Sequence, residues 1–467
     1  MIPVIKNSER GLLEKKDIQY ITAGERNKKG SSQFFLWFAS NLTIGDLALG
    51  SLGLGLGISL NWLLVSVVIG NILGGILLAF MSVMGPKTGL PQMMIGRRSF
   101  GTTGGKIMSG LQWINSMGWF TFNSIIAATA VAVLLFGNGR LTYISAGSGV
   151  TIGLYIFPIL IVCILVALMA YFGERVIHGF EKAMSFVLGI MFVVILYYLL
   201  EKFGTSLITV SGPFSLVAFG TMVALSFSYI MSWGPYASDY SRYVEEKEKS
   251  SRVFIWTLLG SALASIFVEI GGYIIAADAV GQTQISEQVY VLLRPVNLAI
   301  FGLMAIFLGG LAANALNLYS NSLSMKSMGV HMRRSHIVLL VLIVAIFLSY
   351  FGYVNYYSYY EDFLYILDYW ITPWLGIMIA DFFIVGRASS HRGHTSRKVI
   401  AAIFSYVVSI AVSVPFMNPG VVYEGPVAKI LGGIDISYFI SFAVAMILYI
   451  TIFTKFVSGK SVKGEIS

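Results

Sequence analysis

The chain has 467 residues, of which 57% are hydrophobic and only 11% carry a charge. Because about a quarter of the residues of a soluble globular domain are charged, this composition excludes that class and predicts a polytopic membrane protein. The formal net charge of +9 could indicate nucleic acid binding, but the placement of the positive residues argues against nucleic acid as a partner.

Twelve apolar stretches are each about long enough for a helix to cross ~30 Å of hydrocarbon at about 1.5 Å per residue. We therefore predict an all-α membrane protein with twelve transmembrane helices. The predicted spans are residues 34–58, 61–84, 107–135, 150–172, 183–203, 213–237, 253–277, 297–324, 337–354, 360–385, 398–417 and 435–454.

Positive charges are distributed unevenly between the two sides of this map. All 31 Lys and Arg residues fall on one side except Arg140, Lys202, Arg294 and Lys429. Cytoplasmic loops of membrane proteins carry an excess of Lys and Arg. We therefore predict a multi-pass protein of the cell membrane with both termini in the cytoplasm.

We expect no cleaved targeting peptide and no cysteine-based metal site. The first 33 residues are polar and lack the apolar core and cleavage site of a targeting peptide. Cys163 is the single cysteine and lies inside a span, which excludes an intrachain disulfide and a multi-cysteine metal cluster. Five histidines map to loops on the inner side or to their borders and are interpreted as solvated: His178, His331, His336, His391 and His394.

Two spans contain residues that interrupt helices. The first span carries a glycine-rich stretch at 41–57, and the sixth carries Trp233-Gly234-Pro235, where proline removes a backbone donor. Spans one and six cross the membrane in opposite directions, and such paired interruptions are typical of an inverted-repeat transporter. The predicted organisation is an N-terminal segment at 1–33, a first repeat at 34–203, an inverted second repeat at 213–385, two further spans at 398–454 and a tail at 455–467.

The glycines have two interpretations. Gly70, Gly74 and Gly75 have spacing that allows close helix packing, and packing is our prediction for them. From Gly45 to Gly57 the glycines are denser than packing needs, so we predict an unwound segment there.

Carboxylates inside a membrane are costly and are functional candidates. Asp46, Glu269 and Asp381 lie deep in their predicted spans. For Asp46 and Glu269 we predict binding of a proton or coupling ion, with a structural hydrogen bond to unwound backbone as the alternative. Asp239 and Asp278 lie at span ends and are interpreted as caps or interfacial charges.

The third span presents a face suited to a planar ligand. Asn115, Trp119 and Asn123 recur at i, i+4 and i+8 and therefore lie along one side of the helix. The tryptophan ring can stack on a heterocycle, while the amides match the donors and acceptors on a nucleobase edge.

The eighth span carries a similar polar stripe. Asn314, Asn317 and Asn321 stand at i, i+3 and i+7 on one face. Substrate contact and interhelical hydrogen bonding are both open for these residues.

Together with further motifs, the residues described above make the chain resemble the nucleobase–cation symporter family, most closely its purine–cytosine permease branch. The matching motifs run in the expected order through roughly residues 24–386. They are Trp37-Phe-Ala-Ser-Asn41 with Gly50-Ser-Leu-Gly53, Gly85-Pro-Lys-Thr-Gly-Leu90, Arg98-Ser-Phe-Gly101, Gly118-Trp119-Phe120, Trp233-Gly-Pro-Tyr-Ala-Ser-Asp-Tyr240, Asn317-Leu-Tyr-Ser320 and Asp368-Tyr-Trp-Ile-Thr-Pro373.

The resemblance implies a LeuT-type fold of five plus five inverted helices and import of a nucleobase or related heterocycle with Na⁺ or H⁺. It also implies that Trp119 stacks on the substrate and that Asn317 contacts it. Ser232 stands where some relatives hydrogen-bond the base. Asn41 belongs to the first of the matching motifs and is a further candidate.

In two places the chain departs from the family pattern. Some members keep a second stacking aromatic at the position of Ile230, which leaves Tyr229 and Trp233 as candidates here. Sodium-coupled members place hydroxyl residues at the positions of Leu311 and Ala312. Because both hydroxyls are missing, we favour H⁺ over Na⁺, carried by Asp46 and Glu269.

We predict a secondary active importer of cytosine or of a purine such as adenine, guanine or hypoxanthine, working by alternating access. An alternative keeps the fold and carries a hydantoin, a pyridine or a thiamine-like compound. A channel or an enzyme is a remote alternative, because no hydrolase or metalloprotease motif and no ring of acidic pore residues is found. We expect no cofactor besides the coupling ion, and no partners except the small-molecule substrate and membrane lipid.

Overall fold

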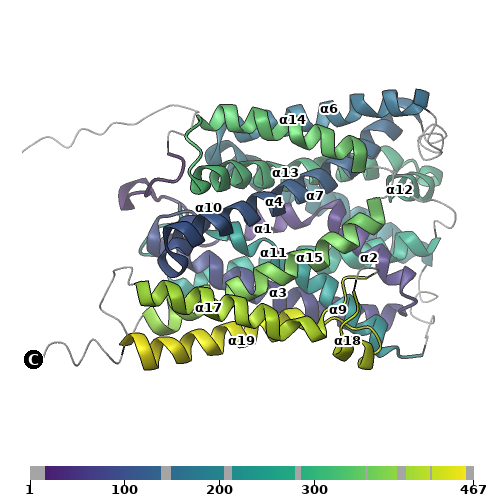
Figure 1. Ribbon diagram of the computed structural model, residues 1–467. Coiled ribbons are helices and arrows are strands. Elements are labelled where there is room, and N and C mark those ends of the chain that lie inside the picture. The colour runs from purple at the N-terminus through teal and green to yellow at the C-terminus, as the bar shows by residue number, and fades with distance from the viewer. Residues whose placement is uncertain are drawn as a thin grey trace, which may run out of the picture.

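A computed structural model describes residues 16–137, 149–203, 213–278, 285–352, 356–386, 396–420 and 423–458. Over these ranges it is a bundle of helices without a β-sheet (Figure 1). In the described part of the chain, eleven helices are long and apolar enough to cross a membrane, and a bent pair at the start makes up to twelve. The prediction of an all-helical, multi-pass membrane protein is therefore confirmed.

The helices follow the predicted spans in chain order. Those that form or continue the spans are α1 (Ser32–Asn41) with α2 (Ile44–Gly55), α3 (Leu60–Thr88), α4 (Gln92–Phe136), α6 (Gly149–Phe172), α7 (Glu174–Phe203), α9 (Leu216–Met231) with η2 (Gly234–Tyr236) and α10 (Ala237–Ser241), α11 (Ser250–Asp278), α13 (Ala299–Met328), α14 (Arg334–Gly352), α15 (Tyr356–Ile379) with η4 (Ala380–Val385), α17 (Ser396–Ser413) and α19 (Ser437–Ile452) with η6 (Phe453–Ser458). Short helices outside them are η1 (Ala23–Glu25), α12 (Ile285–Leu293), η3 (Arg294–Val296), η5 (Val414–Phe416) and α18 (Pro426–Ile430).

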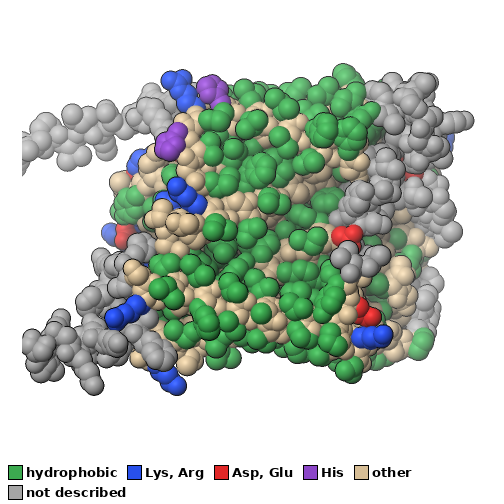
Figure 2. Space-filling view, in the orientation of Figure 1, with side chains coloured by type: hydrophobic (Ala, Val, Ile, Leu, Met, Phe, Trp, Pro, Cys, Tyr) green, Lys and Arg blue, Asp and Glu red, His purple; other side chains and the backbone are tan. Residues whose placement is uncertain are grey.

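The surface of the bundle is apolar between two more polar ends. Figure 2 shows this apolar surface, with most of the Lys, Arg and His side chains in view at the left end. In Figure 1, drawn in the same orientation, η1 and η6 both lie at that end. This distribution of charge matches the predicted asymmetry, while the assignment of this end to the cytoplasm stays a prediction.

The first span is interrupted at Leu42 and Thr43, where the backbone of Thr43 is extended (φ −120°, ψ 166°). We call this interruption the first break. The prediction of an unwound segment at Gly45–Gly57 was wrong, because α2 is helical through Gly55. Gly50 serves packing instead, because a Cβ there would overlap the backbone carbonyl of Glu269 in α11.

This close approach predicts a large effect of a single methyl group. Gly50→Ala should lower the stability of the protein by about 1–3 kcal/mol or more, because neither helix backbone can move aside without losing its packing. Gly55→Ala on the same helix is the matched control, since a Cβ there meets nothing within 4 Å. Thermal unfolding of the purified variants checks this, and an equal midpoint for both would contradict the packing role.

The second break lies where Trp233-Gly234-Pro235 predicted it. Helix α9 ends at Met231, and the chain continues through η2 into the short helix α10. Glycines of α3 bring that helix against α9, because a Cβ on Gly70 or Gly74 would press on backbone carbonyls of α9. The predicted packing role of these glycines is confirmed.

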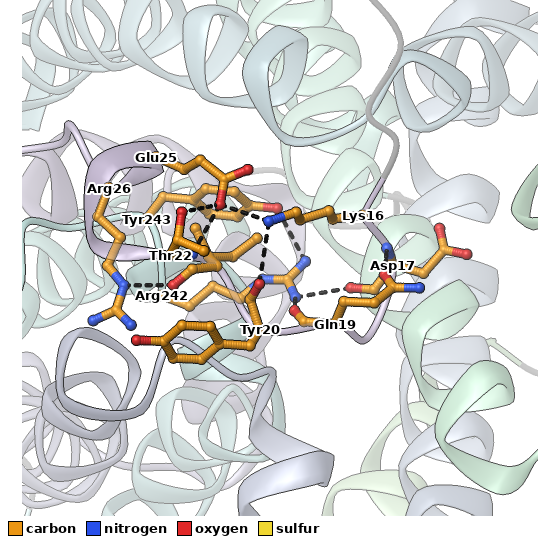
Figure 3. Close-up of polar contacts among 10 residues, drawn as sticks. Lys16, Asp17, Gln19, Tyr20, Thr22, Glu25, Arg26, Arg242 and Tyr243 are labelled. Carbon is orange, nitrogen blue, oxygen red and sulfur yellow. Dashed lines mark hydrogen bonds and ion pairs between the residues drawn. The ribbon is translucent and has the colours of Figure 1, made fainter. Parts of the chain in front are cut away.

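In the N-terminal segment, residues 16–31, the side chains from Lys16 to Arg26 lie close to Arg242 and Tyr243, which follow α10 (Figure 3). Arg242 follows α10, is fully buried, and donates hydrogen bonds to the carbonyl of Asp17 (2.8 Å) and the hydroxyl of Tyr319 (3.1 Å). Arg26 donates to the carbonyl of Pro86 at the end of α3 (2.6 Å). The segment therefore ties α3, α10 and α13 together.

A local turn holds the N-terminal segment in shape. Glu25 accepts hydrogen bonds from the side chain of Lys16 (2.6 Å) and the backbone of Thr22 (2.8 Å). Burial raises the pKa of Glu25, but these hydrogen bonds outweigh it and lower the pKa from 4.5 to about 2. Because the folded pKa is lowered, this contribution to stability is fully present above pH 4.5 and is lost as pH falls toward 2.

Candidate functional site

Trp119 of α4 lies at the centre of an aromatic cluster built from three helices. Its ring meets that of Tyr229 in α9 edge to face, with centroids 5.1 Å apart and an interplanar angle of 85°. On its other sides are Tyr360 and Phe363 of α15, at 6.0 Å and 5.4 Å. The indole Nε1 of Trp119 is buried without a hydrogen-bond partner among the described residues.

Asn123 lies one turn further along α4 and is also unsatisfied. Neither its Oδ1 nor its Nδ2 has a partner in the described part of the chain, although the residue is buried. Gly45, just after the first break, separates it from Tyr229: a Cβ there would lie 3.4 Å from Asn123 Oδ1 and 3.1 Å from the Tyr229 ring. Buried polar atoms are normally paired, so this group of atoms can accept a polar ligand.

Hydrogen bonds attach the first break to this cluster. The hydroxyls of Thr43 and Tyr229 lie 2.7 Å apart, and Tyr360 donates to the carbonyl of Gly45 (3.1 Å). Neither Thr43 nor Tyr360 was among the predicted site residues. The structure thus brings the interrupted first span, α4, α9 and α15 to one place.

Asn317 and Asn314 link α13 to both α4 and the second break. Asn317 accepts a hydrogen bond from Tyr236 (2.9 Å) and donates to Asn314 Oδ1 (3.3 Å). Asn314 in turn donates to Ser124 Oγ (2.9 Å), and Asn321 bonds to α4 two turns away. These contacts are interhelical, so a substrate contact by Asn317 would require it to exchange its bond with Tyr236.

Trp233 is turned toward α1 rather than toward Trp119. Its Nε1 donates to Asn41 Oδ1 (3.1 Å), and its ring lies 5.6 Å from that of Trp37. Of the two candidate second aromatics, Tyr229 is therefore the one that contacts Trp119. Trp233 and Asn41 instead hold the two breaks together.

Asn115 and Ser232 join α4 to the second break. Asn115 Nδ2 donates to the carbonyl of Ser232 (3.3 Å) and to Gln112 Oε1 (2.9 Å). The Ser232 hydroxyl donates to the carbonyl of Tyr229 within its own turn (2.7 Å). Asn115 Oδ1 and Gln112 Nε2 have no partners within the described ranges, so both retain unused hydrogen-bonding capacity.

The two deep carboxylates lie on neighbouring helices. Asp46 of α2 accepts from Ser265 of α11 (2.8 Å), and its other oxygen has no described partner. Glu269 is one turn beyond Ser265 and accepts from Asn71 (2.9 Å) and Ser226 (2.6 Å). Their observed partners are side chains, which does not match the alternative of a bond to unwound backbone.

Asp46 also connects the carboxylate pair to the aromatic cluster. It directly follows Gly45, whose backbone contacts Tyr360 and faces Asn123 and Tyr229. Asp46 and Glu269 are close enough to interact electrostatically. A change of charge on Asp46 or Glu269 therefore changes the electrostatic potential near the unsatisfied side chain of Asn123.

Asp381 is deep in its helix, as predicted, but belongs to a separate ion-paired group. It lies 2.8 Å from Lys398 Nζ and 3.1 Å from Arg98 Nε, and it also accepts from Tyr449. These bonds tie α4, η4, α17 and α19 together. Asp381 therefore has a structural explanation.

Asp239 behaves as a cap, in agreement with its interpretation. Its Oδ1 accepts from the backbone N–H of Gln92 at the start of α4 (2.9 Å), where a helix N-terminus favours negative charge. The side chain of Asp278 and the residues His391 and His394 lie outside what the structure describes.

Comparison with known proteins places this chain in a family. Residues 20–441 match the family model described as a permease for cytosine/purines, uracil, thiamine and allantoin. The candidate purine-cytosine permease YxlA of Bacillus subtilis is 27% identical over 94% of this chain and 95% of its own length. The purine-cytosine permease FCY2 of Saccharomyces cerevisiae is 26% identical over 68% of this chain and 60% of its own length.

The fold also matches a solved transporter. Mhp1, a nucleobase-cation-symport-1 family transporter with bromovinylhydantoin bound, superposes with a TM-score of 0.75 over 95% of this chain and 96% of Mhp1. At 19% identity this similarity shows the fold alone. The predicted LeuT-type fold is confirmed.

Proposed function

This chain belongs to the family of permeases for cytosine, purines, uracil, thiamine and allantoin, and on that basis we propose that it imports cytosine or a purine by proton symport. Purines such as adenine, guanine and hypoxanthine are the first candidates after cytosine. The observation that carries the proposal is the group of unsatisfied atoms on Trp119 and Asn123 beside Tyr229. A base edge offers both donors and acceptors to such atoms, and its faces can stack on the aromatic rings.

The side chains near the two breaks favour a proton over Na⁺ as the coupling ion. Na⁺ requires several oxygen ligands, whereas Leu311 and Ala312 of α13 present none from their side chains. Asp46 and Glu269 instead supply two buried, interacting carboxyl groups next to the site. A proton is the cation that such groups bind most directly, so we favour H⁺.

Alternating access is the proposed cycle. Bending at the two breaks would let the first repeat, residues 34–203, move relative to the inverted second repeat, residues 213–385. Residues 398–454 lie outside the two repeats. The end of the bundle that holds η1 and η6 would face the cytoplasm of a cell-membrane protein. The N-terminal segment, bound to Arg242 and Pro86, would then have to loosen when the inner side opens.

Another planar heterocycle is the second candidate substrate. The family description includes thiamine and allantoin as well as bases, and aromatic side chains such as Trp119 and Tyr229 can also stack on other flat rings. Hydantoins, pyridines and thiamine-like compounds therefore belong in the same assay as competitors.

Uptake into proteoliposomes tests this function. Labelled cytosine, adenine, guanine, hypoxanthine and uracil are supplied under an inward pH gradient or an inward Na⁺ gradient, imposed separately. We expect one or more bases to accumulate under the pH gradient and not under the Na⁺ gradient, and a protonophore to abolish the effect. Accumulation of no base under either gradient would refute the nucleobase proposal, and accumulation that needs Na⁺ but not the pH gradient would refute proton coupling.

A further inference from the structure

Glu181 of α7 is a buried carboxyl group that the site above does not use. The residue has no exposed surface, and neither carboxyl oxygen has a hydrogen-bond partner within the described ranges. The hydropathy pattern predicted the start of this span at residue 183, which placed Glu181 in a loop. Because α7 begins at Glu174, Glu181 instead lies two turns inside a membrane-spanning helix.

Glu181 is the inner end of a row of titratable side chains. Glu174, His178 and Glu181 stand at i, i+4 and i+7 and therefore share one face of α7. Glu174 lies 3.5 Å from Lys28 of the N-terminal segment and 4.0 Å from His178 Nδ1. The row thus runs from the polar end of the bundle to a carboxyl group in its interior.

The helices around Glu181 provide no charge to neutralise it. The buried face of α7 packs against α1 and α13, and Phe35 of α1 meets Phe186 at 5.5 Å. Helix α1 contains no titratable side chain. Apart from weakly acidic tyrosines, the other described titratable or charged side chains on the helices packed against α7 are Lys326 of α13, paired with Asp17, Cys163 of α6, and Arg252 and Glu269 of α11. Helix α11 also ends at Asp278, whose side chain is not described.

We propose that Glu181 is a proton-binding site on the route by which the coupling proton leaves toward the end of the bundle that holds the N-terminal segment. An isolated carboxylate is costly in a buried site without a partner, so the group must hold a proton or gain a new partner before it can ionise. When α1 moves away and admits water, the O–H bond of the Glu181 acid breaks. The proton passes to this water and leaves along the row, past His178 and Glu174, while Glu181 becomes a hydrated carboxylate.

This inference rests on the proposed proton symport but concerns a site separate from Asp46 and Glu269. The test replaces Glu181 by glutamine, which keeps the shape and removes the acid. Glu201→Gln is the matched control, because Glu201 lies on the exposed far end of the same helix. Both variants are purified, checked for folding and reconstituted with the wild type.

We expect Glu181→Gln to lose net uptake driven by a pH gradient, while it still exchanges labelled for unlabelled base and is still stabilised by the base. Exchange needs no proton release, whereas net uptake does. Glu201→Gln should behave like the wild type in all three measurements. Net uptake by Glu181→Gln at the wild-type level would overturn the proposal, while no uptake by the wild type itself would refute the proposed function instead.

Infrared spectroscopy of the purified protein gives a readout that does not depend on the substrate. We expect a carboxylic acid C=O band in the wild type and in Glu201→Gln that is missing in Glu181→Gln. If Glu181→Gln does not fold, Glu181→Asp takes its place and should shift this band. A spectrum unchanged by either substitution would show that Glu181 holds no proton and would overturn the inference, whatever the protein transports.

Discussion

Trp119→Ala is expected to abolish the thermal stabilisation that a nucleobase gives to the purified protein, and Trp119→Phe to retain part of it. Stacking of a base on an aromatic side chain contributes about 1–3 kcal/mol, which corresponds to about a 5- to 150-fold change in affinity. The alanine variant also removes the unsatisfied indole N–H, whereas phenylalanine removes only that donor. The measurement is the shift of the unfolding midpoint over a titration with the transported base.

A control tryptophan separates loss of binding from loss of stability. Trp62 of α3 is 38% exposed on the outside of the bundle and packs on Phe214. Trp62→Ala should change the midpoint of the free protein without changing the shift caused by the base. If Trp119→Ala keeps the full shift, the base does not bind at the aromatic cluster.

Hydropathy located the spans but not the starts of the helices. The third span was predicted from residue 107, whereas α4 is kinked at Gly101 (φ 69°, ψ −174°) and the helix that contains the span begins directly after this kink, so that it includes Lys106. Likewise, α7 begins at Glu174, nine residues before its predicted span. Apolar runs report the part of a helix that matches hydrocarbon, and a helix continues past it wherever polar side chains find partners. For this reason the hydropathy pattern placed Glu181 in a loop rather than in α7.

The first break could not be located from local sequence alone. Glycine allows both an unwound backbone and a close helix contact. Which of these applies at Gly50 is decided by Glu269, more than two hundred residues later in the chain, whose carbonyl group leaves no room for a Cβ. By contrast, Pro235 has one backbone consequence wherever it lies in a helix, so the second break was predictable.

The substrate-facing side of α4 was predictable because helical periodicity places Trp119 and Asn123 on one face. The choice between Tyr229 and Trp233 was not, since it depends on which way the chain turns at the second break. Thr43 and Tyr360 were missed for the same reason: each contributes through a contact between distant segments.

Asp46 and Glu269 would act in one step of the proposed cycle, and Glu181 in another. Asp46 adjoins the aromatic cluster through Gly45, so its protonation should alter base binding as well as transport. Glu181 lies on α7 in a row of side chains that leads to the end of the bundle. Its substitution should therefore alter net uptake but not base binding. The pH dependence of binding therefore separates the two sites.

Asp46→Asn and Glu269→Gln are each expected to abolish accumulation of base under a pH gradient. A gradient of one pH unit supplies about 1.4 kcal/mol per proton, enough for about a tenfold accumulation, and a variant that carries no proton should only equilibrate. The amides can still accept the hydrogen bonds from Ser265 and Ser226, so folding should be retained. The measurements are the accumulation ratio in proteoliposomes and the affinity for base across pH 5 to 8, the range in which we expect the variants to lose pH dependence.

Asp362→Asn is the matched control for these substitutions, because Asp362 is exposed at the start of α15 and lies outside the carboxylate pair. It should accumulate base like the wild type and keep the same pH dependence of binding. If Asp46→Asn and Glu269→Gln both accumulate base as the wild type does, neither carboxyl group carries the coupling ion. Loss of accumulation in only one of them would assign the proton to that residue and leave the other as its hydrogen-bonded or electrostatic neighbour.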